Sequence, residues 1–170
     1  MVLTSLLAAF LIFTGFDFGG RVGAAFPTGS ITRNIRSSTL LGAELGYTFT
    51  RHRFGIQYTF LDFAGKQNSP YEMTIHELAF SYSYALIMKS NWGLAFGAGP
   101  GYGYIQRNYR SARESGTAPD VHLNLFVYQQ ERHSRVCAGI DNTIFFNAPA
   151  NRALVFTYFP AVYAEVGYAF

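Results

Sequence analysis

Two neighbouring pairs of histidine and carboxylate are the residues of this sequence best suited to acid-base chemistry. His76 is followed directly by Glu77, and Asp120 lies two positions before His122. Adjacent residues of a β-strand point to opposite faces, whereas residues two apart share a face. If both segments are strands, His76 and Glu77 diverge, and only Asp120 and His122 can act together.

A hydrolase also needs a nucleophile within hydrogen-bond reach of its base. The serines nearest to the second pair, Ser111 and Ser115, fall in a segment that we expect to be a flexible loop. The four histidines lie far apart, and the single cysteine, Cys137, can form neither an internal disulfide nor a thiolate cage. We therefore expect no catalytic residues, no metal site and no cofactor, with Cys137 as a small buried side chain.

The elements that would position these residues are strands, because apolar and small residues alternate in eight segments. The expected strands span residues 16–26, 41–49, 54–60, 77–86, 92–104, 121–128, 135–146 and 154–170. Most are near the ~9–11 residues that a tilted strand needs to cross a bilayer. The connections after the second, fourth and sixth segments are short, and the others are mostly longer, with the longest at 105–120.

The residue types on the two faces of these segments indicate which face contacts lipid and which faces the lumen. One face is aromatic and aliphatic, and the other carries mainly Gly, Ala, Ser and Thr. Of the 13 Lys and Arg residues, only Arg21 and Arg135 fall within expected strands, both on the small-residue face. A basic residue facing lipid at the midplane costs ~2 to 4 kcal/mol. The pattern predicts an all-β fold: a transmembrane, antiparallel, up-and-down β-barrel with eight strands, short periplasmic turns and longer extracellular loops.

The end of the sequence resembles the assembly signal of bacterial outer-membrane proteins. Val166, Tyr168 and Phe170 alternate up to a terminal aromatic residue. Together with "FGGRVGAAFP" at 18–27 and "GAGPGYGY" at 97–104, this ending is similar to the small eight-stranded bacterial outer-membrane β-barrel family (OmpA/OmpX-like). The resemblance implies a bacterial outer-membrane location, contact with outer-membrane lipid and lipopolysaccharide, and insertion by the barrel-assembly machinery. A closed barrel also satisfies its backbone hydrogen bonds within one chain, so we expect a monomer.

The first residues differ from the rest. A short apolar run at 3–13 has the length of a signal-peptide core, although no Lys or Arg precedes it and no A-x-A site follows. We interpret residues 1–15 as a signal peptide or its remnant, with cleavage near Gly15, and residues 16–170 as the barrel. An interfacial or additional barrel segment is the alternative.

Several charged residues fall on the expected lumen face. They are Asp17, Arg21, Glu44, Glu77, Arg135, Asp141 and Glu165. Buried charges are costly unless paired, and the interior of eight strands is just filled by side chains. We expect these residues to form an ion-pair network that plugs the lumen. The alternatives are a narrow proton or ion channel and a small-ligand pocket; the small residues from Gly93 to Gly103 would make room for Arg21 or relax strand curvature.

Basic residues gather in the expected extracellular loops and suggest a binding surface. Its predicted members are Arg33, Arg36, Arg107, Tyr109, Arg110 and Arg113. Arginine forks suit lipopolysaccharide phosphates or acidic surface polymers, so we predict a non-enzymatic role in surface attachment or envelope stabilisation. The alternatives are solvated loops without a fixed partner and a lipid A-modifying, deacylase-like enzyme. A net charge of +3 spread over loops does not indicate nucleic-acid binding.

Overall fold

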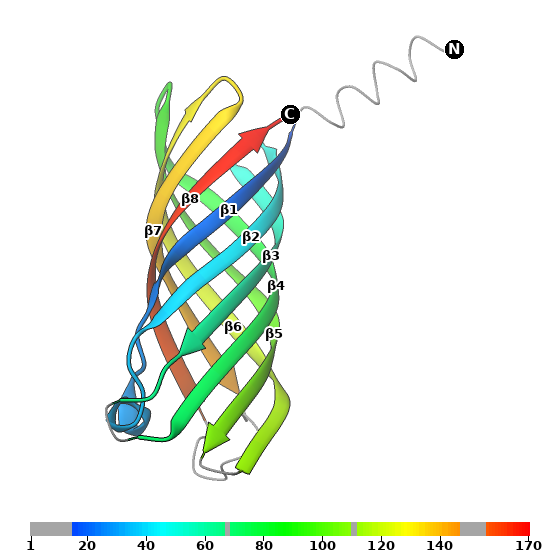
Figure 1. The fold of residues 1–170 in the computed structure, drawn as a ribbon. Coiled ribbons are helices and arrows are strands. Elements are labelled where there is room, and N and C mark those ends of the chain that lie inside the picture. The colour runs from blue at the N-terminus through cyan, green and yellow to red at the C-terminus, as the bar shows by residue number, and fades with distance from the viewer. Residues whose placement is uncertain (1–14, 67–68, 110–111, 147–155) are drawn as a thin grey trace.

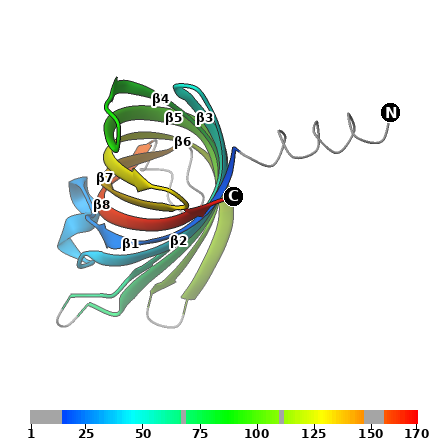
Figure 2. The ribbon, with the colours of Figure 1, turned by 90° about the horizontal axis from the view of Figure 1, so that it is seen from above.

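The computed structural model describes residues 15–66, 69–109, 112–146 and 156–170. Each strand pairs with its neighbours in sequence, and β1 pairs with β8 to close the barrel, as Figures 1 and 2 show. The strands are β1 (Phe16–Ala25), β2 (Ser38–Phe49), β3 (His52–Phe63), β4 (Tyr71–Met88), β5 (Trp92–Tyr109), β6 (Ala112–Glu131), β7 (Ser134–Phe146) and β8 (Phe156–Ala169). The predicted antiparallel barrel is confirmed. The predicted signal segment lies outside the described residues, apart from Gly15.

The two ends of the barrel have different connections. At the end that carries the start of β1 and the end of β8, β2 passes to β3 through Thr50 and Arg51, and β6 passes to β7 through Arg132 and His133. We call this the periplasmic end. At the opposite, extracellular end, the connection from β1 to β2 contains a short 3-10 helix, η1 (Gly29–Arg33) (Figure 1).

Strands β4, β5 and β6 are longer than the sequence pattern suggested. We expected a flexible loop at 105–120, but β5 and β6 remain paired as far as Tyr109 opposite Ala112. Antiparallel pairing satisfies the backbone groups of this hairpin even where its residues, such as Glu114 and Ser115, have low strand propensity. The long loop is therefore mostly strand, and the prediction for it was wrong.

The outer surface of the barrel is an apolar belt. Large apolar side chains point outward from every strand; they include Phe18, Val22, Leu45, Ile56, Phe80, Phe96, Val127, Ile140 and Val166. Val166 exposes 65% of its surface and Phe18 53%. A water-soluble monomer rarely exposes a continuous apolar surface of this kind, so the belt faces the hydrocarbon of a bilayer. Within the described ranges, no helix is long and apolar enough to cross a membrane.

The extracellular half of the lumen holds an apolar core that the sequence pattern had not suggested. The rings of Phe63 and Phe159 lie 4.9 Å apart, and Phe145 packs edge-on against Phe159. Around them lie other buried side chains, namely Ile31, Ile35, Leu40, Leu61, Met73, Ile75 and Ile105. Helix η1 contributes Ile31 to this core. An ionic plug alone was therefore an incomplete expectation, because apolar side chains fill this half of the barrel.

Candidate functional site

Arg53 is the centre of an ion-pair cluster in the periplasmic half of the lumen. It binds Asp17 of β1 and Glu44 of β2, and its Nε lies 3.2 Å from Asp17 Oδ2. Ser81 donates a further hydrogen bond of 3.0 Å to Glu44 Oε1. A Cβ at Gly46 would overlap the Arg53 guanidinium, so the guanidinium occupies the space that this glycine leaves.

The sequence pattern missed Arg53, because it placed this residue in a turn. In the structure β3 begins at His52, and Arg53 pairs with Thr48 of β2. Arg53 then shares the inward parity of Gly55 and Gln57. The parity of the strand was visible in the sequence, and extending the expected strand by one residue would have placed Arg53 on the lumen face.

Arg21 forms a second cluster near the middle of the lumen. Its Nη2 lies 3.1 Å from Asp141 Oδ2 of β7, and its Nε lies 3.7 Å from Glu165 Oε2. Glu165 stands directly opposite Arg21 in the pairing of β1 with β8. The Arg21 guanidinium also lies 3.8 Å from the centre of the Tyr163 ring. The Arg21 side chain thus connects β1 with β7 and β8, across the pair of strands that closes the barrel.

Arg135 of β7 joins the cluster around Arg53. Its Nη1 lies 3.7 Å from Asp17 Oδ2, and its Nε donates to the sulfur of the buried Cys137 at 3.1 Å. The guanidinium lies 5.5 Å from the ring centres of both Phe126 and Tyr128. Arg53 and Arg135 therefore share Asp17 as a partner.

Glu77 is brought close to an acid rather than to a base. It is 1% exposed, and no ion pair with it is found among the described residues. Asp120 of β6 and His122 lie in the same part of the lumen, and His122 Nε2 contacts the Phe80 backbone oxygen at 3.0 Å. Asp120 and His122 are both buried on the inward face of the barrel and therefore do not face the surrounding lipid.

The strand-face prediction for His76 and Glu77 agrees with the structure. His76 is exposed on the outer surface, where its Nδ1 lies 2.8 Å from the Tyr58 hydroxyl, whereas Glu77 points inward. Ser115 is part of β6, not of a loop, and Ser111 lies outside the described residues. Within the described ranges, no cluster of three or more His, Cys, Asp or Glu side chains is arranged to hold a metal ion.

The small residues of β5 make room for inward side chains of other strands. A Cβ at Gly97 would overlap Asn124, one at Gly101 would overlap Asp120, and one at Gly103 would overlap Phe145. None of the atoms nearest to these glycines belongs to Arg21. The expectation that this stripe makes room for Arg21 was therefore wrong; the stripe accommodates side chains of β6 and β7.

Not all of the predicted loop residues lie on the outside of the barrel. Arg33, Arg36 and Arg113 are exposed at the extracellular end, and Arg113 Nη2 donates to Gln106 Oε1 at 2.6 Å. Tyr109 is also exposed and packs against Tyr71. Arg107, in contrast, belongs to β5 and is 5% exposed because its parity turns it inward. The prediction that Arg107 belongs to an outer binding surface was therefore wrong. Arg110 lies outside the described residues.

The three residues of the predicted assembly signal lie on the outer surface, two of them in β8 and Phe170 directly after it. Val166, Tyr168 and Phe170 are all exposed, and the rings of Tyr168 and Phe170 meet edge-on at 5.4 Å. The backbone N–H of Phe170 donates to the Phe16 oxygen at 2.9 Å, which extends the contact between the two closing strands.

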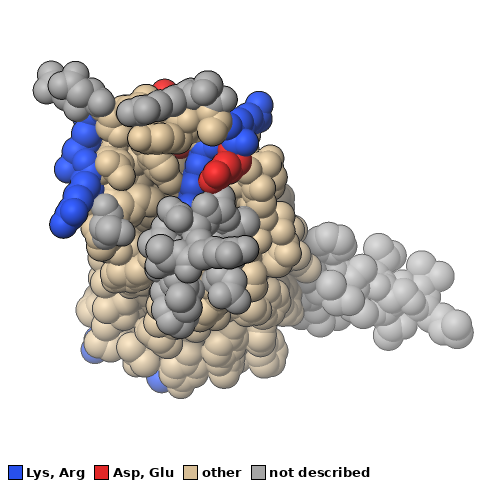
Figure 3. Space-filling model, turned by 90° about the horizontal axis from the view of Figure 1, so that it is seen from below, with Lys and Arg blue, Asp and Glu red and all other residues tan. Residues whose placement is uncertain are grey.

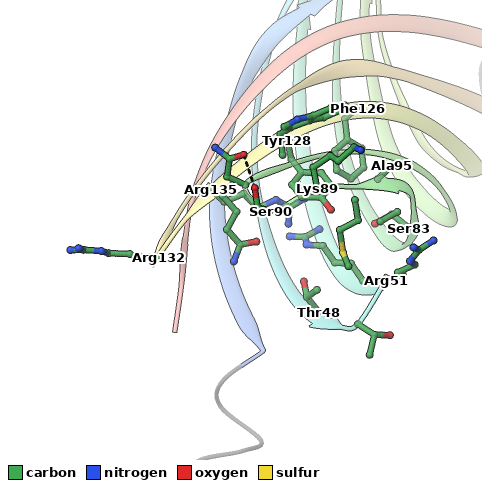
Figure 4. A pocket seen from close by; sticks show the side chains of 17 residues that line it. Thr48, Arg51, Ser83, Lys89, Ser90, Ala95, Phe126, Tyr128, Arg132 and Arg135 are labelled. Atoms are coloured by element: carbon green, nitrogen blue, oxygen red, sulfur yellow. Dashed lines mark hydrogen bonds between the residues drawn. The ribbon is translucent and has the colours of Figure 1, made fainter.

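A pocket opens at the periplasmic end, in the space between the ion-pair clusters and the short turns (Figure 4). Its volume is about 330 Å³, and its lining includes Arg51, Lys89, Arg135 and Tyr128. A second cavity of about 10 Å³ lies deeper, between Glu44, Arg53 and Glu165. The lumen thus changes from an open basic mouth to ion pairs and then to an apolar core.

Comparison with solved structures identifies the architecture. Neisserial surface protein A (NspA) superposes with a TM-score of 0.76 at 14% identity, over 92% of this chain and 97% of that chain. The N-terminal barrel domain of Pseudomonas aeruginosa OprF gives a TM-score of 0.58 at 7% identity, over 89% and 96% of the two chains. Ail, the attachment invasion locus protein of Yersinia pestis, gives 0.57 at 9% identity, over 92% and 97%.

No protein-family model and no curated protein matches the sequence. At these identities the likeness to solved structures shows the fold. Almost all of this chain superposes on each of these three small barrels. The apolar belt on the outside of this chain also requires a bilayer. The chain therefore has the fold of the small eight-stranded bacterial outer-membrane β-barrels, the OmpA/OmpX-like group that its sequence resembles.

Proposed function

We propose that this protein is a non-enzymatic outer-membrane barrel that acts in surface attachment or envelope stabilisation, by binding acidic polymers at its extracellular end. The observation that carries the proposal is a set of exposed cations around that end, which we call the basic rim. It consists of Arg33, Arg36, Lys66 and Arg113. Figure 3 shows Lys and Arg side chains at two places on this end, one of them beside acidic side chains.

The charge balance of the rim supports an anionic partner. Among the residues that the structure describes, the exposed acids at the same end are Asp62, Glu72 and Glu114, one fewer than the four cations of the rim. Two further arginines of the sequence, Arg110 and Arg152, fall in the neighbouring connections and lie outside the described residues. Because Arg107 and Asp120 both point into the barrel, neither changes this balance.

The chemistry of the rim suits phosphate and sulfate groups. Three of its four cations are arginines, whose planar forks bind such groups with two parallel hydrogen bonds. The partners that fit are lipopolysaccharide phosphates and acidic surface polymers. Ail, which shares this fold with a TM-score of 0.54 in a second structure, was solved in complex with the heparin analogue sucrose octasulfate. A barrel of this architecture can therefore present a polyanion site.

The interior supports a role without transport or turnover. Apolar side chains such as Phe63 and Phe159 fill the extracellular half of the lumen, and ion pairs cross the other half. The acid-histidine pair is buried inside, away from lipid A. Monomeric assembly and insertion by the barrel-assembly machinery, with Val166, Tyr168 and Phe170 as the recognised ending, belong to the same proposal.

The experiment replaces three arginines of the basic rim. In intact cells that display the barrel, Arg33→Gln/Arg36→Gln/Arg113→Gln should weaken binding of labelled heparin by about tenfold at low salt, since each exposed charge contact contributes ~0.2–1 kcal/mol. The difference should shrink as salt rises, because exposed charges are screened. Intact cells restrict the probe to the extracellular face.

The matched control keeps the positive charges but replaces the planar guanidinium groups with ammonium groups. Arg33→Lys/Arg36→Lys/Arg113→Lys should retain most of the affinity, and the amount of folded protein should be equal in all strains. Heparin binding that is unchanged by the Gln variant at low salt would refute the basic rim as the binding surface. Release of fatty acid from lipid A by the purified protein would refute the non-enzymatic role.

A further inference from the structure

The pocket at the periplasmic end has the size of a small-molecule site. Its volume of about 330 Å³ lies within the ~300–1,000 Å³ typical of ligand pockets. Three short turns border it, through Thr50 and Arg51, through Lys89 to Asn91, and through Arg132. The ion pairs of Arg53 and Arg135 form its floor.

The pocket is lined by cations. Its lining includes Arg51, Arg53, Lys89, Arg132 and Arg135, and no Asp or Glu is among the described residues that line it. Arg53 and Arg135 are balanced from below by Asp17 and Glu44. For Arg51 and Lys89, no ion pair occurs within the described part of the chain. Figure 4 shows Arg132 pointing away from the cavity. Arg51 and Lys89 are then the lining cations of the mouth that have no ion pair among the described residues.

One wall of the pocket is apolar, and the strand geometry builds it. A β-bulge between Ala85 and Ile87 shifts the register so that Met88 stands opposite the inward-facing Gly93. A bulge of this kind re-aims the side chains that follow it, and Met88 lines the cavity. A Cβ at Gly93 would overlap the Tyr128 ring, so this glycine leaves the space that the ring occupies.

The aromatic side chains of this wall are held in place. The Arg135 guanidinium lies 5.5 Å from the ring centres of Phe126 and Tyr128, within the range of a cation–π contact. Trp92, at the start of β5, lines the pocket as well. A rigid aromatic wall beside uncompensated cations is suited to a ligand with one apolar part and one negative charge.

We propose that this pocket binds a small amphiphilic anion from the periplasm, in which a phosphate or carboxylate group is joined to an apolar group. Arg51 and Lys89 bind the anionic group, and Met88, Phe126 and Tyr128 contact the apolar group. The site is independent of the basic rim, because the ion-pair clusters and the apolar core separate the two ends of the barrel.

The single tryptophan of the chain lies at the border of this site. Trp92 is the only tryptophan in the sequence and lines the pocket. Titrating the detergent-folded protein with phenyl phosphate should therefore produce a saturable change in tryptophan fluorescence. Arg51→Gln/Lys89→Gln should raise the dissociation constant about tenfold, as expected when two exposed charge contacts to one anion are lost. The charge-matched variant Arg33→Gln/Arg36→Gln, at the other end of the barrel, should leave it unchanged.

Three comparison probes test each part of the ligand class. Benzoate in place of phenyl phosphate tells which anionic group is preferred, and binding of either one supports the site. Inorganic phosphate should bind more weakly than phenyl phosphate, and equal binding would overturn the contact with the apolar wall. Benzyl alcohol should also bind more weakly, and equal binding would overturn the role of the cations. Absence of saturation with both aromatic anions, or equal affinity in Arg51→Gln/Lys89→Gln, would overturn the proposal as a whole.

Discussion

At the scale of single residues, Arg53 shows how the lumen is held together. Its guanidinium binds carboxylates from two other strands, Asp17 of β1 and Glu44 of β2, and all three side chains are buried. Removing one partner of a buried ion pair leaves a charge without compensation, which costs more than the pair contributes. The stability of the periplasmic half should therefore depend strongly on this one side chain.

Arg53→Leu should lower the free energy of unfolding by ~3–5 kcal/mol, because Asp17 and Glu44 are left unpaired. Denaturant titration of the barrel in lipid vesicles measures the change. Adding Asp17→Asn and Glu44→Gln to Arg53→Leu should restore part of the loss, since no buried charge then lacks a partner. Arg51→Leu, two residues away and exposed, is the control and should change stability little. An Arg53→Leu barrel as stable as the original would show that water, not the two carboxylates, solvates this guanidinium.

At the scale of the elements, period-2 alternation was enough to predict all eight strands, since lipid on one face and a narrow lumen on the other impose opposite residue types. It did not predict where the strands begin and end, because charged residues near the strand ends, such as Arg53 and Arg107, interrupt the alternation of apolar and small residues although backbone pairing continues through them. The buried Arg53 and Arg107 were missed for this reason. The apolar core was missed too, although Leu61 and Phe63 continue the inward parity of Gln57 and Thr59.

The last strand carries a prediction of its own. Phe170→Ala should reduce the amount of barrel in the outer membrane severalfold and leave the unfolding free energy of the folded protein nearly unchanged. The side chain is 61% exposed, and the backbone bond from Phe170 to Phe16 survives the substitution. Ile140→Ala, which truncates an outward side chain of β7, is the matched control for lost lipid contact. If both variants reach the membrane at the level of the original protein, the ending is not an assembly signal.

At the scale of the whole molecule, the barrel is a closed cylinder with two chemically different ends. The extracellular end exposes the basic rim above an apolar core, and the periplasmic end opens into a basic pocket above ion pairs. Side chains just fill the interior of an eight-stranded barrel. Here ion pairs occupy the periplasmic half of the lumen, and apolar side chains occupy the extracellular half. Among the described residues, ion pairs and packed apolar side chains therefore lie between the two proposed binding sites.

Planar-bilayer recording of the purified protein tests this closure most directly. The structure predicts no large, steady conductance, because a permeating ion would have to pass the ion pairs of Arg21 and Arg53 and then the packed rings of Phe63, Phe145 and Phe159. Phe63→Ala/Phe159→Ala, which leaves the ionic half intact, should remain closed as well. Large and steady single-channel currents from the original protein would contradict the account of a plugged barrel.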